Sequence, residues 1–366
     1  MISDKVKGLL QQMIEKEASD LYLKVGSPPC FRVYGRLVLL EQAFLTSEEV
    51  ASYAQSILNE EQKERFTLTH EVDLAVSLPD FGRFRANVYS QRGSCSVVFR
   101  SIKSSVPSFE ALGLPAKVLE QLCKELRGLV LVTGTTGSGK STSIAAALDY
   151  INTNFERHIL TIEDPIEFVH HDKKSIISQR EVGSDTASFH SALHHIMRQT
   201  PDVIYIGDIR DLETMSSAIG AAETGQLVIA PMHTINASQT IERIINFFPT
   251  HQHHEVRVQL ALLLKGVISI RLIPRRDGKG RVPACEVMML TPTIRGLIHD
   301  GLTLQIPGFI QEGRVFGMQS FNQAILELYQ TGKISLEAAR DYADNRDELE
   351  LALKGFKAGS KGLAGR

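Results

Sequence analysis

The first hundred residues contain short runs in which apolar and polar positions alternate, a pattern typical of β-strands. Before these runs, residues 4–16 show the apolar spacing of an amphipathic helix, and Thr46-Ser47-Glu48-Glu49 has the form of a capped helix start. The strand-like runs cover residues 20–24, 30–34, 37–40, 71–78, 82–90 and 94–101. The pattern predicts an α+β domain over residues 1–102.

Residues 103–115 separate this domain from the rest of the chain. They begin with the polar run Lys103-Ser104-Ser105-Val106-Pro107-Ser108, and we interpret them as an interdomain linker. Beyond the linker, apolar strands alternate with helical patterns, and the strands cover residues 129–133, 159–162, 203–206 and 227–230. Such alternation is the signature of a mostly parallel sheet covered by helices, so we predict an α/β core over residues 116–290.

The pattern becomes helical after this core. Apolar residues recur at helical spacing over residues 321–329 and 336–342, so we predict a C-terminal helical region over residues 291–353. The last residues, 354–366, are rich in glycine and lysine and contain few large apolar side chains. We expect a flexible tail there, because such a segment cannot bury enough apolar surface to order itself.

Composition and charge narrow the function classes. The chain has 366 residues, of which 43% are hydrophobic and 22% are charged, as expected for a globular protein with two domains. The formal net charge of −2 gives no global basic field, so nucleic-acid binding is not expected, although a local basic patch stays open. No apolar run reaches the roughly 18 residues that span a bilayer, and the polar N-terminus differs from a signal peptide. We therefore expect a cytoplasmic protein.

Cysteine and histidine give little sign of a structural metal site. The four cysteines are scattered without a C-x-x-C pair, which argues against a disulfide framework and a four-thiolate zinc site; they are Cys30, Cys95, Cys123 and Cys285. Histidines gather at residues 190–194 and 251–254, but no acidic or cysteine partner lies at a familiar spacing. We interpret both groups as solvated helix faces.

The sequence Gly134-Thr135-Thr136-Gly137-Ser138-Gly139-Lys140-Ser141 has the form of a phosphate-binding loop. An apolar strand leads into it, and an alanine-rich helix continues from Thr142 onward. The glycines let backbone N–H groups turn toward a polyphosphate, Lys140 adds a positive charge, and the Ser141 hydroxyl can bind Mg²⁺. This context favours binding of a nucleoside triphosphate by residues 134–142 over an ordinary glycine-rich turn.

Two acidic segments and one histidine follow the predicted strands of the core. Glu163 and Asp164 end one strand, where Glu163 could deprotonate the attacking water and Asp164 could help to hold Mg²⁺; alternatively, both merely begin a loop. Asp208 follows the next strand and is a second candidate for the metal side of the site. His233 follows a third strand, where it is either placed to sense the γ-phosphate or buried as a core histidine.

Taken together, these motifs resemble the secretion ATPase superfamily, in particular the type IV pilus retraction ATPases PilT and PilU. The resemblance covers nearly the whole chain and rests on the phosphate loop and on Glu163-Asp164-Pro165, Gly207-Asp208-Ile209-Arg210-Asp211, Ala222-Glu223-Thr224-Gly225, Ala18-Ser19-Asp20-Leu21 and Gly317-Met318-Gln319-Ser320-Phe321. It implies a PAS-like N-terminal domain joined by a linker to a RecA-like P-loop ATPase domain with C-terminal helices.

The resemblance also implies a function and partners. It implies a homohexamer that hydrolyses ATP with Mg²⁺ and removes pilins at the pilus base, cytoplasmic and peripheral at the inner membrane. The implied partners are an inner-membrane platform protein and a paralogous retraction ATPase. Family roles carry over to Lys140 and Ser141 as phosphate and Mg²⁺ ligands, Glu163 as catalytic glutamate, Asp208 in the second acidic motif, His233 in the histidine motif, and Arg85, Arg92 and Arg100 in the region that supplies arginine fingers.

Within the superfamily, the lack of a four-cysteine zinc element argues against the pilus-assembly and type II secretion motors, and Arg180-Glu181-Val182-Gly183 leans toward PilU. The chain has Asp208 where the family usually has glutamate, Gln226 where histidine is usual, and Pro231, which lacks a backbone N–H. We expect nucleotide binding to survive these changes. Two hypotheses stay open, an active motor and a weakly hydrolysing subunit that assists a paralogous motor; a RecA-like DNA translocase is a more distant alternative.

Overall fold

The computed structural model describes residues 2–78, 82–102 and 105–354, which belong to two compact units. The first unit comprises Met1–Ser105 with the short segment Ile166–Val169, and the second comprises Val106–Pro165 with His170–Arg366. The second unit includes most of the residues interpreted from the sequence as a linker, because Phe109 and Leu114 are buried in its core. Apart from Lys354, the predicted tail lies outside the described residues.

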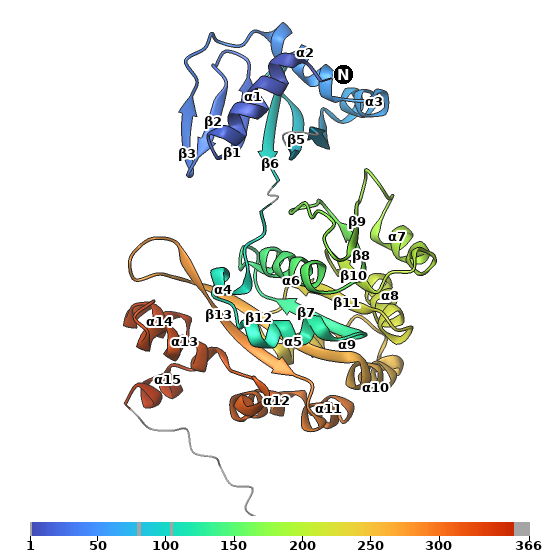
Figure 1. Cartoon of the computed structure of the whole chain (residues 1–366), viewed down its shortest axis with the longest axis vertical. Coiled ribbons are helices and arrows are strands. Elements are labelled where there is room, and N and C mark those ends of the chain that lie inside the picture. The colour runs from blue at the N-terminus through green and yellow to red at the C-terminus, as the bar shows by residue number, and fades with distance from the viewer. Residues whose placement is uncertain (1, 79–81, 103–104, 355–366) are drawn as a thin grey trace, which may run out of the picture. The chain divides into compact units, whose positions relative to one another are not determined.

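The first unit is built on a six-stranded antiparallel sheet with the strand order β3-β2-β1-β6-β5-β4 (Figure 1). The strands are β1 (Ala18–Lys24), β2 (Cys30–Val33), β3 (Arg36–Leu39), β4 (Glu71–Leu78), β5 (Gly82–Gln91) and β6 (Ser94–Ser101). The helices of this unit are α1 (Asp4–Glu15), α2 (Ser47–Ile57) and α3 (Glu60–Thr69). The expected N-terminal α+β domain is confirmed, and the strand bounds agree with the sequence pattern to within two residues.

Apolar side chains on one face of this sheet form the core of the first unit. Leu21, Phe84 and Phe99 are completely buried there, and the alternate positions along β5 are polar. Helix α3 was not expected, because its sequence carries no apolar stripe. In agreement with this, none of its residues is buried. A capping box between Asn59 and Gln62 marks its start.

The second unit contains a seven-stranded sheet with the order β13-β12-β7-β11-β10-β8-β9. Its strands are β7 (Gly128–Thr133), β8 (His158–Glu163), β9 (Ile176–Glu181), β10 (Val203–Ile206), β11 (Leu227–Met232), β12 (Leu264–Pro274) and β13 (Arg281–Met289). Only β13 runs antiparallel to its neighbour. Every residue of β7, β10 and β11 is buried, as expected where helices cover both faces of a parallel sheet.

The helices of the second unit pack on this sheet, on its β12–β13 hairpin or on one another. They are α4 (Phe109–Leu112), α5 (Ala116–Lys124), α6 (Lys140–Asn154), α7 (Phe189–Ile196), α8 (Leu212–Glu223), α9 (Ala237–Ile245), α10 (His253–Leu263), α11 (Pro292–His299), α12 (Ile306–Glu312), α13 (Phe321–Gln330), α14 (Leu336–Tyr342) and α15 (Arg346–Leu353). Phe321 and Ile325 of α13 share a small core with Ile273 of β12 and Val282 of β13. Among the described residues, no helix has the length and apolar content that crossing a membrane requires.

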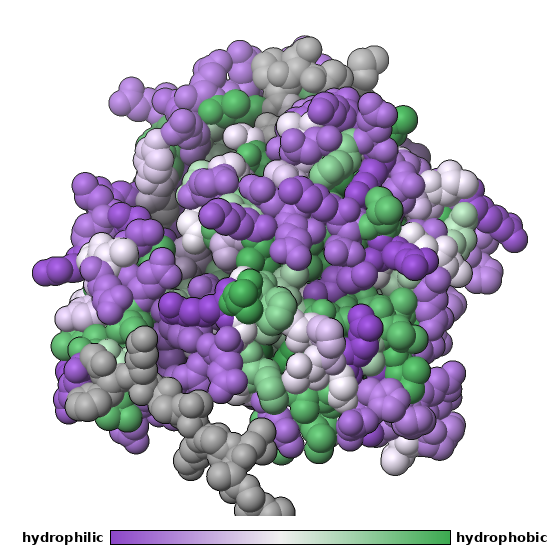
Figure 2. Space-filling model, turned by 60° about the horizontal axis from the view of Figure 1, so that its bottom comes forward, coloured by the Kyte–Doolittle hydropathy of each residue, from purple (hydrophilic) through white to green (hydrophobic). Residues whose placement is uncertain are grey.

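The four core strands expected from the sequence are present, whereas β9, β12 and β13 were not expected. β9 is an edge strand with the mixed sequence Ile-Ile-Ser-Gln-Arg-Glu, and the long apolar run of β12 does not distinguish a strand from a buried helix. On the surface, Figure 2 shows one face on which hydrophobic residues gather in patches between hydrophilic ones. Exposed apolar side chains of the second unit include Leu304 and Val315.

Candidate nucleotide-binding site

The phosphate loop joins β7 to α6 and has glycine where the backbone enters the left-handed region. Gly134, Gly137 and Gly139 have φ angles of +147°, +76° and +96°, which other residues rarely adopt. A Cβ atom at Gly134 would also lie 2.5 Å from the carbonyl oxygen of Ile270, so a larger residue does not fit. Helix α6 begins at Lys140, directly after the loop. The loop therefore leads into a helix N-terminus, where N–H groups and the helix dipole favour phosphate.

Lys140 is buried inside the curve of this loop. Its Nζ atom donates hydrogen bonds to the carbonyl oxygens of Gly134 (2.8 Å) and Thr135 (2.9 Å). The Oγ atom of Ser138 is also buried, and it has no hydrogen-bond partner among the described residues. A buried hydroxyl without a partner is uncommon in folded proteins, so this position suits a site that receives polar atoms of a ligand.

Glu163 is the last residue of β8, and only 7% of it is exposed. Its Oε1 atom accepts hydrogen bonds from Thr161 Oγ1 (2.6 Å) and from Gln179 Nε2 (3.0 Å). These donors hold the carboxylate at the end of the strand. Neither Thr161 nor Gln179 was predicted from the sequence as part of the site. The two-residue spacing on one strand face could have indicated Thr161, whereas Gln179 belongs to the unexpected strand β9.

Asp208 lies just after β10 and contacts His233 and Arg210. Its Oδ1 atom is 3.6 Å from His233 Nε2, and its Oδ2 atom is 2.5 Å from Arg210 Nε. The Asp208 side chain is 15% exposed, compared with 50% for His233. His233 is therefore not a core histidine. The Oδ1 atom of Asp208 is buried and accepts no hydrogen bond from the described residues, which leaves it suited to a ligand or its hydration shell.

The topology of the sheet brings these groups to one edge. Strands β7, β11, β10 and β8 are consecutive neighbours and run parallel, so their C-terminal ends lie side by side. The Gly134 N–H donates to the carbonyl oxygen of Met232 (3.3 Å), and the Gly207 N–H donates to that of Ile162 (2.7 Å). Each of these four strands ends at one group of the candidate site. In the order of the strands, these groups are the phosphate loop, His233, Asp208 and Glu163.

The groups at this edge fit a nucleoside triphosphate with a divalent cation. The turned loop and Lys140 match phosphate oxygens in shape and charge. Oxygen ligands of the kind that Mg²⁺ prefers are available from the hydroxyl of Ser141, from Asp208, and from Asp164, which is exposed at the end of β8.

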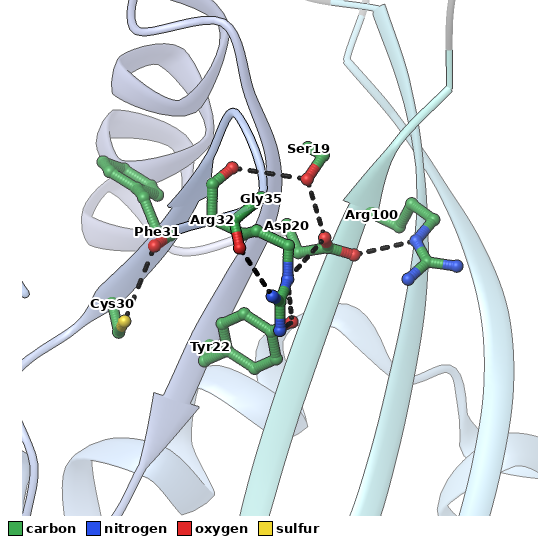
Figure 3. A network of polar contacts seen from close by, with 8 residues as sticks. All are labelled: Ser19, Asp20, Tyr22, Cys30, Phe31, Arg32, Gly35 and Arg100. Atoms are coloured by element: carbon green, nitrogen blue, oxygen red, sulfur yellow. Dashed lines mark hydrogen bonds and ion pairs between the residues drawn. The ribbon is translucent and has the colours of Figure 1, made fainter. Parts of the chain in front are cut away.

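Arg100, one of the three candidate arginine fingers, belongs to a polar network in the first unit (Figure 3). The buried carboxylate of Asp20 accepts a hydrogen bond from Arg100 Nε (2.7 Å) and lies 3.4 Å from Arg32 Nε. Arg32 in turn donates hydrogen bonds to the Tyr22 hydroxyl at 2.7 and 2.9 Å. The guanidinium of Arg100 is thus held by an acidic partner on the neighbouring strand β1, while 68% of its side chain is exposed.

The other two candidates lie in the same unit. Arg85 is the cross-strand neighbour of Arg100, and its Nη2 atom is 3.2 Å from Asp73 Oδ1. Arg92 occupies the turn between β5 and β6 with a φ angle of +49°. The structure therefore groups Arg85 and Arg100 on one face of the sheet, and it places Arg92 at the end of the same hairpin.

Gln226 and Pro231, which the resemblance marks as departures from the family, lie near opposite ends of β11. Gln226 precedes the first residue of the strand, and its carbonyl oxygen accepts a hydrogen bond from Gly128 N (3.0 Å). It therefore lies at the sheet edge opposite the phosphate loop, roughly 20 Å along the strand from Met232. Pro231 pairs in register with Val132, beyond the last paired residues of β10 and β11. The position of Gln226 gives no support to a direct effect on hydrolysis.

Comparison with known proteins decides the family. Residues 1–339 match the family model described as Type II/IV secretion system protein. The chain belongs to this family. It is 42% identical over 346 residues to the Type IV pilus ATPase PilU of Pseudomonas aeruginosa, covering 94% of this chain and 90% of that protein. It is 43% identical over 335 residues to the Type IV pilus retractation ATPase PilT of the same organism, covering 92% and 97%.

A solved structure agrees with this assignment. The crystal structure of the pilus retraction motor PilT with bound ADP has a TM-score of 0.86 and 44% sequence identity to this secretion-family chain, covering 93% of it and 98% of the PilT chain. The recognition of the pilus retraction ATPase family and the expected fold are thereby confirmed. The nearly equal identities to PilT and PilU do not separate these two subgroups.

Proposed function

We propose that this protein is a cytoplasmic ATPase that powers type IV pilus retraction, and thereby twitching motility. PilU and PilT of Pseudomonas aeruginosa support this proposal, because both are type IV pilus ATPases and the matches cover 90% or more of their lengths. The chain is an enzyme that binds ATP and hydrolyses it. Mg²⁺, when bound, neutralises charge on the phosphates.

The observation that carries the proposal is the gathering of the phosphate loop, Glu163, Asp208 and His233 at one edge of the parallel sheet. Lys140 and the loop N–H groups bind the phosphates. Ser141, with Asp164 and Asp208, holds Mg²⁺ or its water shell. Glu163, fixed by two hydrogen-bond donors, accepts the proton of the attacking water. His233, next to Asp208, is the residue that we propose to sense the γ-phosphate.

Steady-state ATPase assays on the purified full chain test this function. We expect Lys140→Ala and Glu163→Gln to lower turnover to background, and we expect Glu163→Gln to keep nucleotide binding because it leaves the loop intact. Glu125→Gln, a carboxylate outside the site that pairs with Lys265, serves as the control. Wild-type turnover no higher than that of the two site variants would refute the proposal. Stimulation by DNA would instead favour a translocase.

Within this function we propose the accessory role of a PilU-like motor. The support is the shorter carboxylate of Asp208, which is engaged by Arg210 at 2.5 Å, and the lean of the sequence toward PilU. Pilus retraction measured in cells that lack either this protein or its paralogue distinguishes the roles. Retraction at the normal rate without the paralogue would show a main motor. An ATPase rate near background would favour the weakly hydrolysing alternative.

We further propose a homohexamer in which Arg85, Arg92 and Arg100 supply arginine fingers, recruited to the inner membrane by the platform protein at the pilus base. The support is the family membership and the exposure of the Arg100 side chain. Light scattering with ATP tests the hexamer. Arg100→Ala should lower kcat in the assembled protein, whereas Arg32→Ala is the matched control, because Arg32 shares the Asp20 carboxylate but is not a finger candidate. Equal loss in both variants would contradict the assignment.

A further inference from the structure

A buried carboxyl group lies next to the nucleotide-binding edge and takes no part in the proposed chemistry. Glu286 belongs to β13 and is 5% exposed. Its Oε1 atom accepts a hydrogen bond from the backbone N–H of Ala237 (2.8 Å) and a longer one from the hydroxyl of Ser269 (3.4 Å). Burying a carboxyl group is costly, and the packing of this core alone would be served by an apolar residue.

On one side, Glu286 connects to the strand that leads into the phosphate loop. Ser269 of β12 accepts a hydrogen bond from Thr133 Oγ1 (3.0 Å), and Thr133 directly precedes Gly134. Thr133, Ser269 and Glu286 are register partners across β7, β12 and β13, so they form one row across the sheet. Thr133 and Ser269 are completely buried, which shields both hydrogen bonds from water.

On the other side, Glu286 holds the start of α9. Ala237 is the first residue of this helix, and its N–H is one of the helix N-terminal donors that find no partner inside the helix. Asn236 caps the helix separately by accepting from Gln239 N (2.9 Å). Thr234 is hydrogen-bonded to Thr240 (2.7 Å), which ties the short segment between His233 and α9 to the helix itself. Fixing α9 therefore also fixes the segment that begins with His233.

Together, these hydrogen bonds and the chain between them form a closed loop next to the site. Met232, at the end of β11, accepts from Gly134 N, and His233 follows it. From there the chain passes to Ala237, and the hydrogen bonds return through Glu286 and Ser269 to Thr133. We infer that Glu286 is a positioning residue for ATP hydrolysis, which holds the His233 segment at a fixed place relative to the phosphate loop. This inference rests on the proposed ATPase function.

A positioning role differs from a merely structural one in what a substitution changes. Glu286→Ala removes the acceptor for Ala237 and Ser269 but leaves the phosphate loop and Lys140 in place. Since a displacement of about 1 Å can cost about a hundredfold in rate, we expect kcat to fall at least about tenfold while KM for ATP changes less than about twofold. Glu286→Gln keeps an oxygen acceptor, so its kcat should stay within about threefold of wild type.

The experiment measures kcat and KM of the full-length wild type and variants in the presence of Mg²⁺. Ser269→Ala, which cuts only the connection to β7, should lower kcat less than Glu286→Ala. The control is Asn152→Ala, because Asn152 is equally buried and its side chain bonds His171 O (2.8 Å) and Lys173 N (3.0 Å), near the far end of α6. Its kcat should match the wild type.

Three results would overturn the inference: an unchanged kcat in Glu286→Ala, no rescue by glutamine, or an equal loss of kcat in Asn152→Ala. If Glu286→Ala does not fold, Ser269→Ala still decides, since a wild-type kcat there contradicts the connection. If the wild type hydrolyses ATP and the variants hydrolyse it equally fast, the inference is wrong but the proposed ATPase function stands. A complete lack of turnover in the wild type would overturn both.

Discussion

Replacing Glu286 with glutamine should make the protein more stable at alkaline pH. Burial raises the pKa of Glu286 from 4.5 to about 7, and the nearby Asp344 adds to the effect, while the Ala237 N–H, Ser269 and Arg271 oppose it. The unfolded chain releases this proton at the lower pH. Stability from this group is therefore complete below about pH 4.5 and is lost as the pH rises through about 7. A shift of this size corresponds to about 3 kcal/mol.

Glutamine keeps the oxygen acceptor for Ala237 and does not ionise. The variant therefore does not lose stability through this position as the pH rises. Urea unfolding of both full-length proteins between about pH 5 and about pH 8, followed by circular dichroism, gives the difference between their unfolding free energies. Contributions from other titrating groups cancel in that difference. Between these two pH values it should shift by about 2.5 kcal/mol in favour of glutamine. A flat difference, or one that shifts in favour of glutamate, would refute the reasoning.

Asp20→Ala should lower the free energy of unfolding by about 1–3 kcal/mol, because it removes the buried acceptor of Arg100; the exposed control Asp73→Ala should cost less than about 1 kcal/mol in the same urea titration. Asp208→Glu should raise kcat for ATP, by up to about a hundredfold, since it restores the reach of the carboxylate; an unchanged or lower kcat would contradict this. Gln226→His should leave kcat within about twofold, and a larger change would show that the opposite sheet edge influences hydrolysis.

Much of the fold could be predicted because the chain alternates apolar and polar positions with clear periods. In the first unit the period of two is clearest along β4 and β5, where buried apolar positions alternate with more exposed ones. In the second unit the continuous apolar runs of β7, β10 and β11 mark buried parallel strands. The edge strand β9 and the hairpin of β12 and β13 escaped prediction. The mixed sequence of β9 and the continuous apolar run of β12 do not fix the type of element, and β12 also pairs with β7, which lies far earlier in the sequence.

The candidate site divides in the same way. Residues such as Lys140 and Glu163 could be placed from sequence, because each follows an apolar strand and the C-terminal ends of parallel strands meet at one edge. Gln179 and Glu286 could not, because each acts from a strand that the pattern did not reveal. The pairing of Arg100 with Asp20 was equally hidden, since the two residues are 80 positions apart and meet only through the strand register.

The position of β7 explains why contacts outside the sequence motifs matter for the site. β7 lies between β11 and β12. On one side, the phosphate loop is therefore bonded to the strand that ends next to His233, and on the other to the strand that carries Ser269. A shift of the phosphate loop would therefore act on both β11 and β12. Glu286 connects β12 to α9, the helix that follows His233. Ser269 should consequently influence hydrolysis more than Gln226, although Ser269 belongs to no motif. Gln226 is a position that the resemblance marks as a departure from the family, but it lies at the opposite edge of the sheet.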